Sequence, residues 1–136
     1  MVNVYPASVM AKPRKRVGFR IPEYFPPRLA WRRLVLEEAR KAVKRARVVY
    51  SPSERLQVHV RLYFHDPALD LHDLDNRAKD VLDALQGRLG GSKRARPRNP
   101  VIPNDRQIWR LIVEKSAPPK QSHNLGHVTV RLLQTA

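Results

Sequence analysis

Two aspartates separated by a single residue, Asp73 and Asp75, lie in an acidic stretch of a strongly basic chain. Six of the 12 acidic residues fall between Asp66 and Asp83, whereas Lys and Arg together number 27 and the formal net charge is +15. A chain this basic suits an anionic partner, which a cluster of bare carboxylates would repel. The conflict disappears if the carboxylates bind divalent cations, because the bound ions then attract a phosphate.

The spacing of these aspartates suits a magnesium site. In an extended segment, Asp73 and Asp75 would point the same way and lie roughly 6–7 Å apart, so that they could share one ion or hold two. Asp105 precedes a predicted strand and would reach the same point if that strand pairs with the preceding one. Lys79, four residues after Asp75, would place an ammonium near the phosphate. These residues predict a metal-dependent phosphodiester hydrolase.

The same residues also have a simpler structural interpretation. An aspartate before a helix is commonly only a cap, and two aspartates around one residue are a frequent pattern. Lys79 could form an ordinary surface pair with Asp75 or Asp83. Asp80 and Asp83 are expected on the solvent side of the following helix. His59 and His65 share the polar face of a predicted strand, but they lie too far apart to chelate one ion locally, so we interpret them as ordinary strand histidines.

Hydrophobic periodicity predicts a single α+β (mixed α/β) domain across residues 1–136, with a small mixed sheet and two main helices. Residues 56–65 alternate as a half-buried strand, and apolar residues at helical spacing predict a helix over 28–47. A second helix is expected from about Asp75, which would cap it, to Gly87, which suits its end. Further strands are expected around residues 17–21, 107–115 and 128–134.

Basic residues gather on the first helix, beside the acidic residues and in the loop 87–104, whereas residues 1–16 are a candidate flexible basic arm. Each group suits phosphate contact, and each could instead be a solvated surface. The residues expected to contact DNA are Arg33, Arg40, Lys44, Arg77, Lys93, Arg94, Arg96, Arg98 and Arg106.

Composition excludes other classes of protein. The chain has no cysteine, so disulfides and zinc–thiolate sites are excluded. No apolar run approaches the ~18 residues of a membrane span, and no signal-type segment follows the N-terminus. We therefore expect no membrane partner, and a cytoplasmic, nucleoid-associated location.

The segments 72–87 and 101–111 resemble the RusA family of Holliday-junction resolvases. The shared features are Asp73-Leu74-Asp75-Asn76, Lys79, the helix end from Leu82 to Gly87, and Asn104-Asp105-Arg106-Gln107-Ile108. The two segments together hold 27 residues, and their shared features are far more specific than the two aspartates alone. The order of strand, helix and strand extends the likeness over most of the chain.

The resemblance implies a homodimeric, Mg²⁺-dependent endonuclease that cuts four-way DNA junctions by paired symmetric incisions. Mn²⁺ is a second candidate ion. It also implies a compact mixed-sheet fold. Asp73, Asp75 and Asp105 fall where the family has its metal-binding aspartates, and Lys79 falls on its catalytic lysine.

The chain departs from the family pattern at two places. Asn104 stands where many members have an additional acid, and the loop between Gly87 and Asp105 is longer and more basic than expected. The competing hypotheses are a non-catalytic basic nucleic-acid-binding protein and a metal nuclease that acts on other branched DNA or on RNA.

Overall fold

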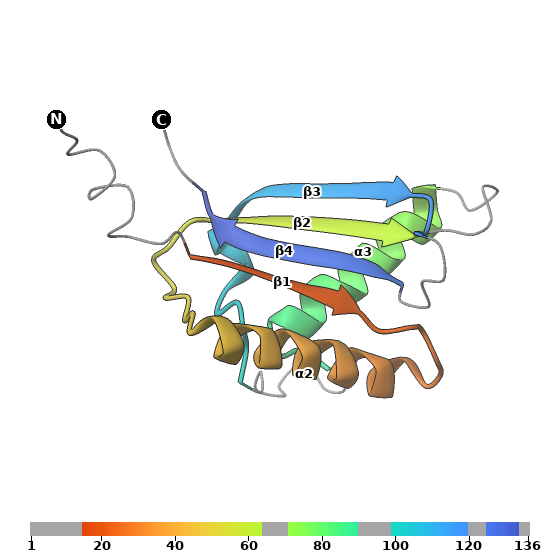
Figure 1. Ribbon diagram of the computed structural model, residues 1–136, viewed down its shortest axis with the longest axis horizontal. Coiled ribbons are helices and arrows are strands. Elements are labelled where there is room, and N and C mark those ends of the chain that lie inside the picture. The colour runs from red at the N-terminus through yellow and green to blue at the C-terminus, as the bar shows by residue number, and fades with distance from the viewer. Residues whose placement is uncertain (1–14, 64–70, 90–98, 120–124, 134–136) are drawn as a thin grey trace, which may run out of the picture.

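A computed structural model describes residues 15–63, 71–89, 99–119 and 125–133, with the side chains of residues 71–73 outside that description. The predicted α+β class is confirmed: one small domain combines two main helices with a four-stranded mixed sheet (Figure 1). The elements in chain order are β1 (Arg16–Ile21), α2 (Arg28–Ala46), β2 (Leu56–Tyr63), α3 (Leu71–Leu85), the short 3₁₀ helix η1 (Asp105–Gln107), β3 (Ile108–Ser116) and β4 (Gly126–Leu132).

The strands lie in the order β1-β4-β2-β3, so β3 and β1 form the edges of the sheet. β4 pairs antiparallel with both β1 and β2, whereas β2 and β3 are parallel. A parallel pair needs a crossover connection, and α3 supplies it between β2 and β3. Gly126 is required at the start of β4, because a Cβ there would lie 2.0 Å from the Arg61 carbonyl oxygen of β2.

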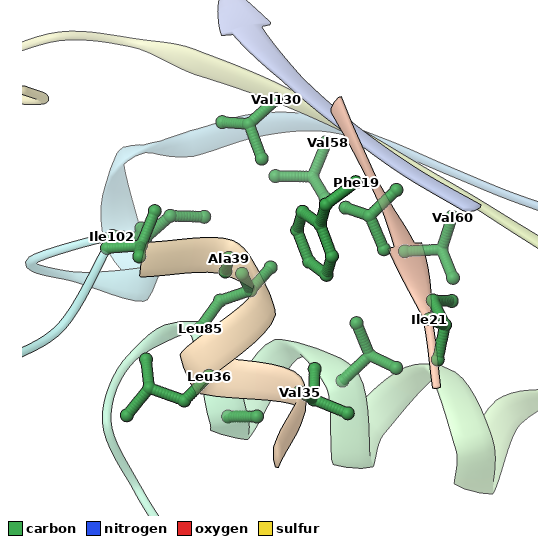
Figure 2. Close-up of a cluster of buried hydrophobic side chains, with 14 of the residues drawn as sticks. Phe19, Ile21, Val35, Leu36, Ala39, Val58, Val60, Leu85, Ile102 and Val130 are labelled. Carbon is green, nitrogen blue, oxygen red and sulfur yellow. The ribbon is translucent and has the colours of Figure 1, made fainter. Parts of the chain in front are cut away.

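Both helices pack against the same face of the sheet. The alternate residues Val58, Val60 and Leu62 of β2 are fully buried, as strict alternation in the sequence predicts. Figure 2 shows strand residues such as Phe19 and Ile21 packed with Val35 and Leu36 of α2 and with Leu85 of α3. The opposite face of the sheet, which we call the open face, is covered by no helix within the described residues.

Helix α3 begins earlier than its predicted start. We expected Asp75 to cap a helix, but the helix already starts at Leu71, so Asp75 lies inside it. The predicted end is confirmed: Gly87 has a positive φ of 74° and donates its backbone N–H to the Ala84 carbonyl, while Arg88 N–H reaches the Asp83 carbonyl. This closure leaves α3 with a defined end next to the segment that leads into η1.

Candidate functional site

Asp75 and Lys79 lie one helical turn apart near the start of α3, and both side chains are exposed. Residues four apart on a helix are neighbours on one face, as predicted from the spacing. The start of α3 follows the carboxyl end of β2, on the right of Figure 1. The pair therefore presents one carboxylate and one ammonium to solvent at this end of the sheet.

Asp73 lies in the same helix, which changes its relation to Asp75. The prediction that both carboxylates point the same way assumed an extended segment, and that assumption is wrong because α3 begins at Leu71. Positions two apart on a helix do not face each other. The shared metal site expected from spacing alone therefore does not follow from this backbone.

Asp105 lies in a hydrogen-bonded turn at the start of β3. Asn104 caps η1: its side chain accepts a hydrogen bond from the Arg106 N–H at 2.9 Å, and the Gln107 side chain accepts one from the Asn104 N–H at 2.9 Å. The buried Gln107 also donates to the carbonyls of Ser51 and Glu54. Asn104 thus has a structural role as a helix cap.

Within one chain, Asp105 lies at the opposite end of α3 from Asp75. The N–H groups of Val101 and Ile102 donate to the Leu85 carbonyl at 2.9 and 3.0 Å, which fixes the segment before Asp105 at the end of the helix. From Asp75 to Leu85 the helix rises about 15 Å.

The direction of β3 explains this separation. β3 does pair beside β2, but in parallel, with Ile108 opposite Leu56 at the start of β2. Asp105 therefore precedes the amino end of the pair, whereas α3 follows its carboxyl end. The expectation that Asp105 reaches the other two aspartates is wrong for a single chain.

Asp80 is a buried acid that the sequence analysis placed on the solvent side. Only 1% exposed, it accepts hydrogen bonds from Arg28 and Arg32 of α2, and Arg77 lies 3.7 Å from its second oxygen. Burial opposes its ionisation, but the hydrogen bonds and the positive charges of Arg28 and Arg32 together outweigh burial, so the pKa of Asp80 is lowered. The error arose because α3 packs against α2 as well as the sheet, so two of its sides are buried.

The predicted DNA contacts divide into several groups. Arg33, Arg40 and Lys44 are exposed on α2, and the last two border a groove of about 870 Å³ beside Val101. Arg106 is exposed beside Asp105. Arg77 instead stacks on the ring of Tyr24, with its guanidinium carbon 3.8 Å from the ring centre. The remaining predicted contacts lie outside the described residues; they are Lys93, Arg94, Arg96 and Arg98, together with most of the basic arm.

The carboxylates are suitable donors for Mg²⁺, but the described residues do not bring three of them together. Mg²⁺ prefers oxygen ligands, and the exposed Asp75 carboxylate provides them. Nowhere in the described part of the chain do three or more His, Asp or Glu side chains come together as a metal site would require. The three-aspartate centre that the resemblance implies is therefore not formed by the described side chains, which do not include that of Asp73.

No protein-family model matches this chain, and a search of curated proteins finds no match. The resemblance to resolvases therefore depends on the residues quoted above. None of the helices within the described segments has the length and apolarity needed to cross a membrane.

Proposed function

We propose that the protein is a Mg²⁺-dependent endonuclease that cuts four-way DNA junctions by paired hydrolysis, in the cytoplasm and in contact with the nucleoid. The observation that carries this proposal is the exposed pair Asp75 and Lys79, placed side by side on a chain whose net charge is +15. A carboxylate on a basic surface is unfavourable for a protein that only binds DNA, but it is useful for one that binds a metal ion against a phosphate.

The proposal includes a homodimer in which each active site is shared between subunits. β3 is a nine-residue edge strand, and Trp109 and Leu111 on it are 59% and 46% exposed. Such an edge is open to pairing with another chain. If two β3 strands pair antiparallel around a two-fold axis, Asp105 of one subunit approaches the carboxyl end of the partner's sheet, where α3 begins. Asp73 and Asp75 would then meet Asp105 of the partner subunit.

The roles of the residues follow from their chemistry. Asp75 and the partner's Asp105 would hold Mg²⁺, or Mn²⁺ in its place, and the resemblance adds Asp73, whose side chain lies outside the described residues. The ion would polarise the phosphate and help to generate hydroxide. Lys79 would neutralise charge that grows on the phosphate oxygens in the transition state. The exposed cations Arg33, Arg40 and Lys44 would contact the DNA backbone.

A labelled synthetic four-way junction tests the activity, with a matched linear duplex as the control substrate. In Mg²⁺ the protein should cut the junction at symmetric positions and leave the duplex intact. Asp75→Asn should abolish cleavage yet keep junction binding, because it removes a ligand charge without altering the basic surface. Cleavage by Asp75→Asn at the wild-type rate would end the proposed role of this carboxylate.

The second candidate function is a non-catalytic nucleic-acid-binding protein. The observation that favours it is that no three-residue acidic site forms among the described residues. This candidate predicts tight binding to DNA and no cleavage of junction, duplex or RNA in either Mg²⁺ or Mn²⁺. The same labelled substrates therefore distinguish the two functions.

A further inference from the structure

Positive charge crosses the open face of the sheet in two rows. The strand register places Arg16, Arg131, Gln57 and Arg110 opposite one another across all four strands, and it does the same for Arg20, His127, Arg61 and Glu114. The rows lie four residues apart along each strand, a separation of about 13 Å. Between them lies a row without Lys, Arg, Asp or Glu, made up of Gly18, Thr129, His59 and Ile112.

Three of these arginines are available to bind a ligand. Arg16, Arg20 and Arg131 are exposed, and in the described part of the chain none of them has a hydrogen-bond or ion-pair partner. The four strands contain a single acid, Glu114. Glu114 accepts a hydrogen bond from Arg61 at 3.0 Å and lies beside His59. Its negative charge therefore offsets Arg61 and does not pair with Arg16, Arg20 or Arg131. The face therefore carries uncompensated positive charge, which an anionic ligand would neutralise.

His127 lies within this positive field. Its ring lies on Gly18, where a Cβ would come within 3.1 Å of the ring. Burial lowers the pKa of His127, and the neighbouring Arg20, Arg61, Arg16 and His59 lower it further. These groups lie on the two strands that flank β4, so cations from both sides converge on the centre of the sheet.

We infer that the open face is the main docking surface for a duplex DNA arm, with the two rows contacting the two phosphate backbones that border a groove. The separation of the rows is close to the ~12 Å width of the major groove of B-DNA. This inference rests on the proposed function for its choice of DNA, and it adds the surface by which the DNA is held. That surface is opposite the helices and was not among the predicted contacts.

The composition of the face favours duplex DNA over other partners. Single strands are held mainly by stacking bases on aromatic side chains. None of the three rows contains Phe, Tyr or Trp, and Tyr63 lies beyond the second row, at the end of β2. A protein partner would need an apolar centre, and the middle row offers one large apolar residue, Ile112, at 36% exposure. Rows of guanidinium groups on either side of Gly18, Thr129 and His59 instead suit phosphates.

The test compares two triple variants that remove equal charge from opposite sides of the molecule. One is Arg16→Ala, Arg20→Ala, Arg131→Ala on the open face, and the other is Arg33→Ala, Arg40→Ala, Lys44→Ala on α2. Binding to a short linear duplex is measured without metal over a range of salt concentrations. The open-face variant should flatten the slope of log K against log salt by about 2–3 units, and the α2 variant should flatten it less. Equal slopes for the two variants, or a larger loss in the α2 variant, would overturn the inference.

A second measurement follows the proton on His127 by NMR titration. Duplex binding should raise the pKa of His127, because phosphates offset the neighbouring arginines. The open-face triple variant should raise that pKa even without DNA. An unchanged His127 titration on addition of saturating duplex would contradict docking at this face, whatever the affinity.

The outcome is separable from that of the nuclease proposal. Binding is measured without metal, so it does not depend on cleavage. If the wild type cuts no junction but the two triple variants show the predicted difference in salt slope, the nuclease is disproved and the docking surface is supported. A protein that cuts junctions while both triple variants bind alike supports the nuclease and disproves the surface. Glu114→Gln should have the opposite effect on affinity. It removes the one acid of the four strands, so duplex binding should tighten.

Discussion

Lys79 is placed so that its effect on catalysis can be measured separately from DNA affinity. It is exposed one turn after Asp75, and the described side chains include no ion pair between the two. We expect Lys79→Ala to lower the single-turnover cleavage rate by two or more powers of ten, on the order of 3 kcal/mol, because charge stabilisation in the transition state is lost. Junction affinity should change little. An equal loss of affinity and rate would make Lys79 an ordinary phosphate contact.

Asp80 is the residue that joins α3 to α2. Its carboxylate lies between Arg28 and Arg32, and the Arg32 side chain is only 10% exposed. We expect Asp80→Asn to destabilise the fold by about 3 kcal/mol, because the buried Arg32 loses its main counter-charge. Asp83→Asn is the matched control: Asp83 is 27% exposed and lies 3.5 Å from Arg32, so its loss should cost under about 1 kcal/mol. Denaturant unfolding of both variants measures the difference, and equal values would contradict this role of Asp80.

The same carboxylate determines a pH dependence of stability. The pKa of Asp80 is lowered in the folded state, so the stabilisation from its ion pairs is complete above its unfolded-state pKa of about 3.9. It decreases as the pH falls below that value towards the folded-state pKa. Acid unfolding curves of the wild type and Asp80→Asn should therefore converge at low pH and separate towards neutrality.

At the scale of the elements, the sequence predicted most of the fold. Strict alternation located β2, helical spacing located α2, and glycine located the end of α3, because each signal comes from residues close together in the chain. The start of α3 was placed four residues too late, because aspartate is a preferred N-cap residue and the sequence therefore favours Asp75 as the cap. The helix in fact begins at Leu71. The open face was missed as a unit, because its rows depend on strand order and register, which link residues as distant as Arg16 and Arg131.

The candidate site was also predicted only where its residues are close together in the chain. Local spacing correctly placed Asp75 and Lys79 on one helical face. It could not place Asp105, which precedes β3. The position of Asp105 depends on whether β3 runs parallel or antiparallel to β2, and local spacing does not determine that direction. Parallel pairing moves Asp105 to the far end of α3. The three-aspartate arrangement that the resemblance implies would therefore need a second chain to bring Asp105 close to Asp75.

At the scale of the whole molecule, the separation of Asp75 from Asp105 gives the homodimer a decisive test. Asp75→Asn and Asp105→Asn should each abolish cleavage on their own.

The decisive measurement mixes the two variant proteins so that their subunits exchange. If the sites are shared, each heterodimer contains one site that carries both substitutions and one site that carries neither. About a quarter of all sites should then be intact after random exchange, and junction nicking should return. If each site were built within one chain, every site would carry a substitution and the mixture would remain inactive. An inactive mixture, with subunit exchange verified by labelled protomers, would exclude the shared site; recovered nicking would explain why the aspartates lie apart in one chain.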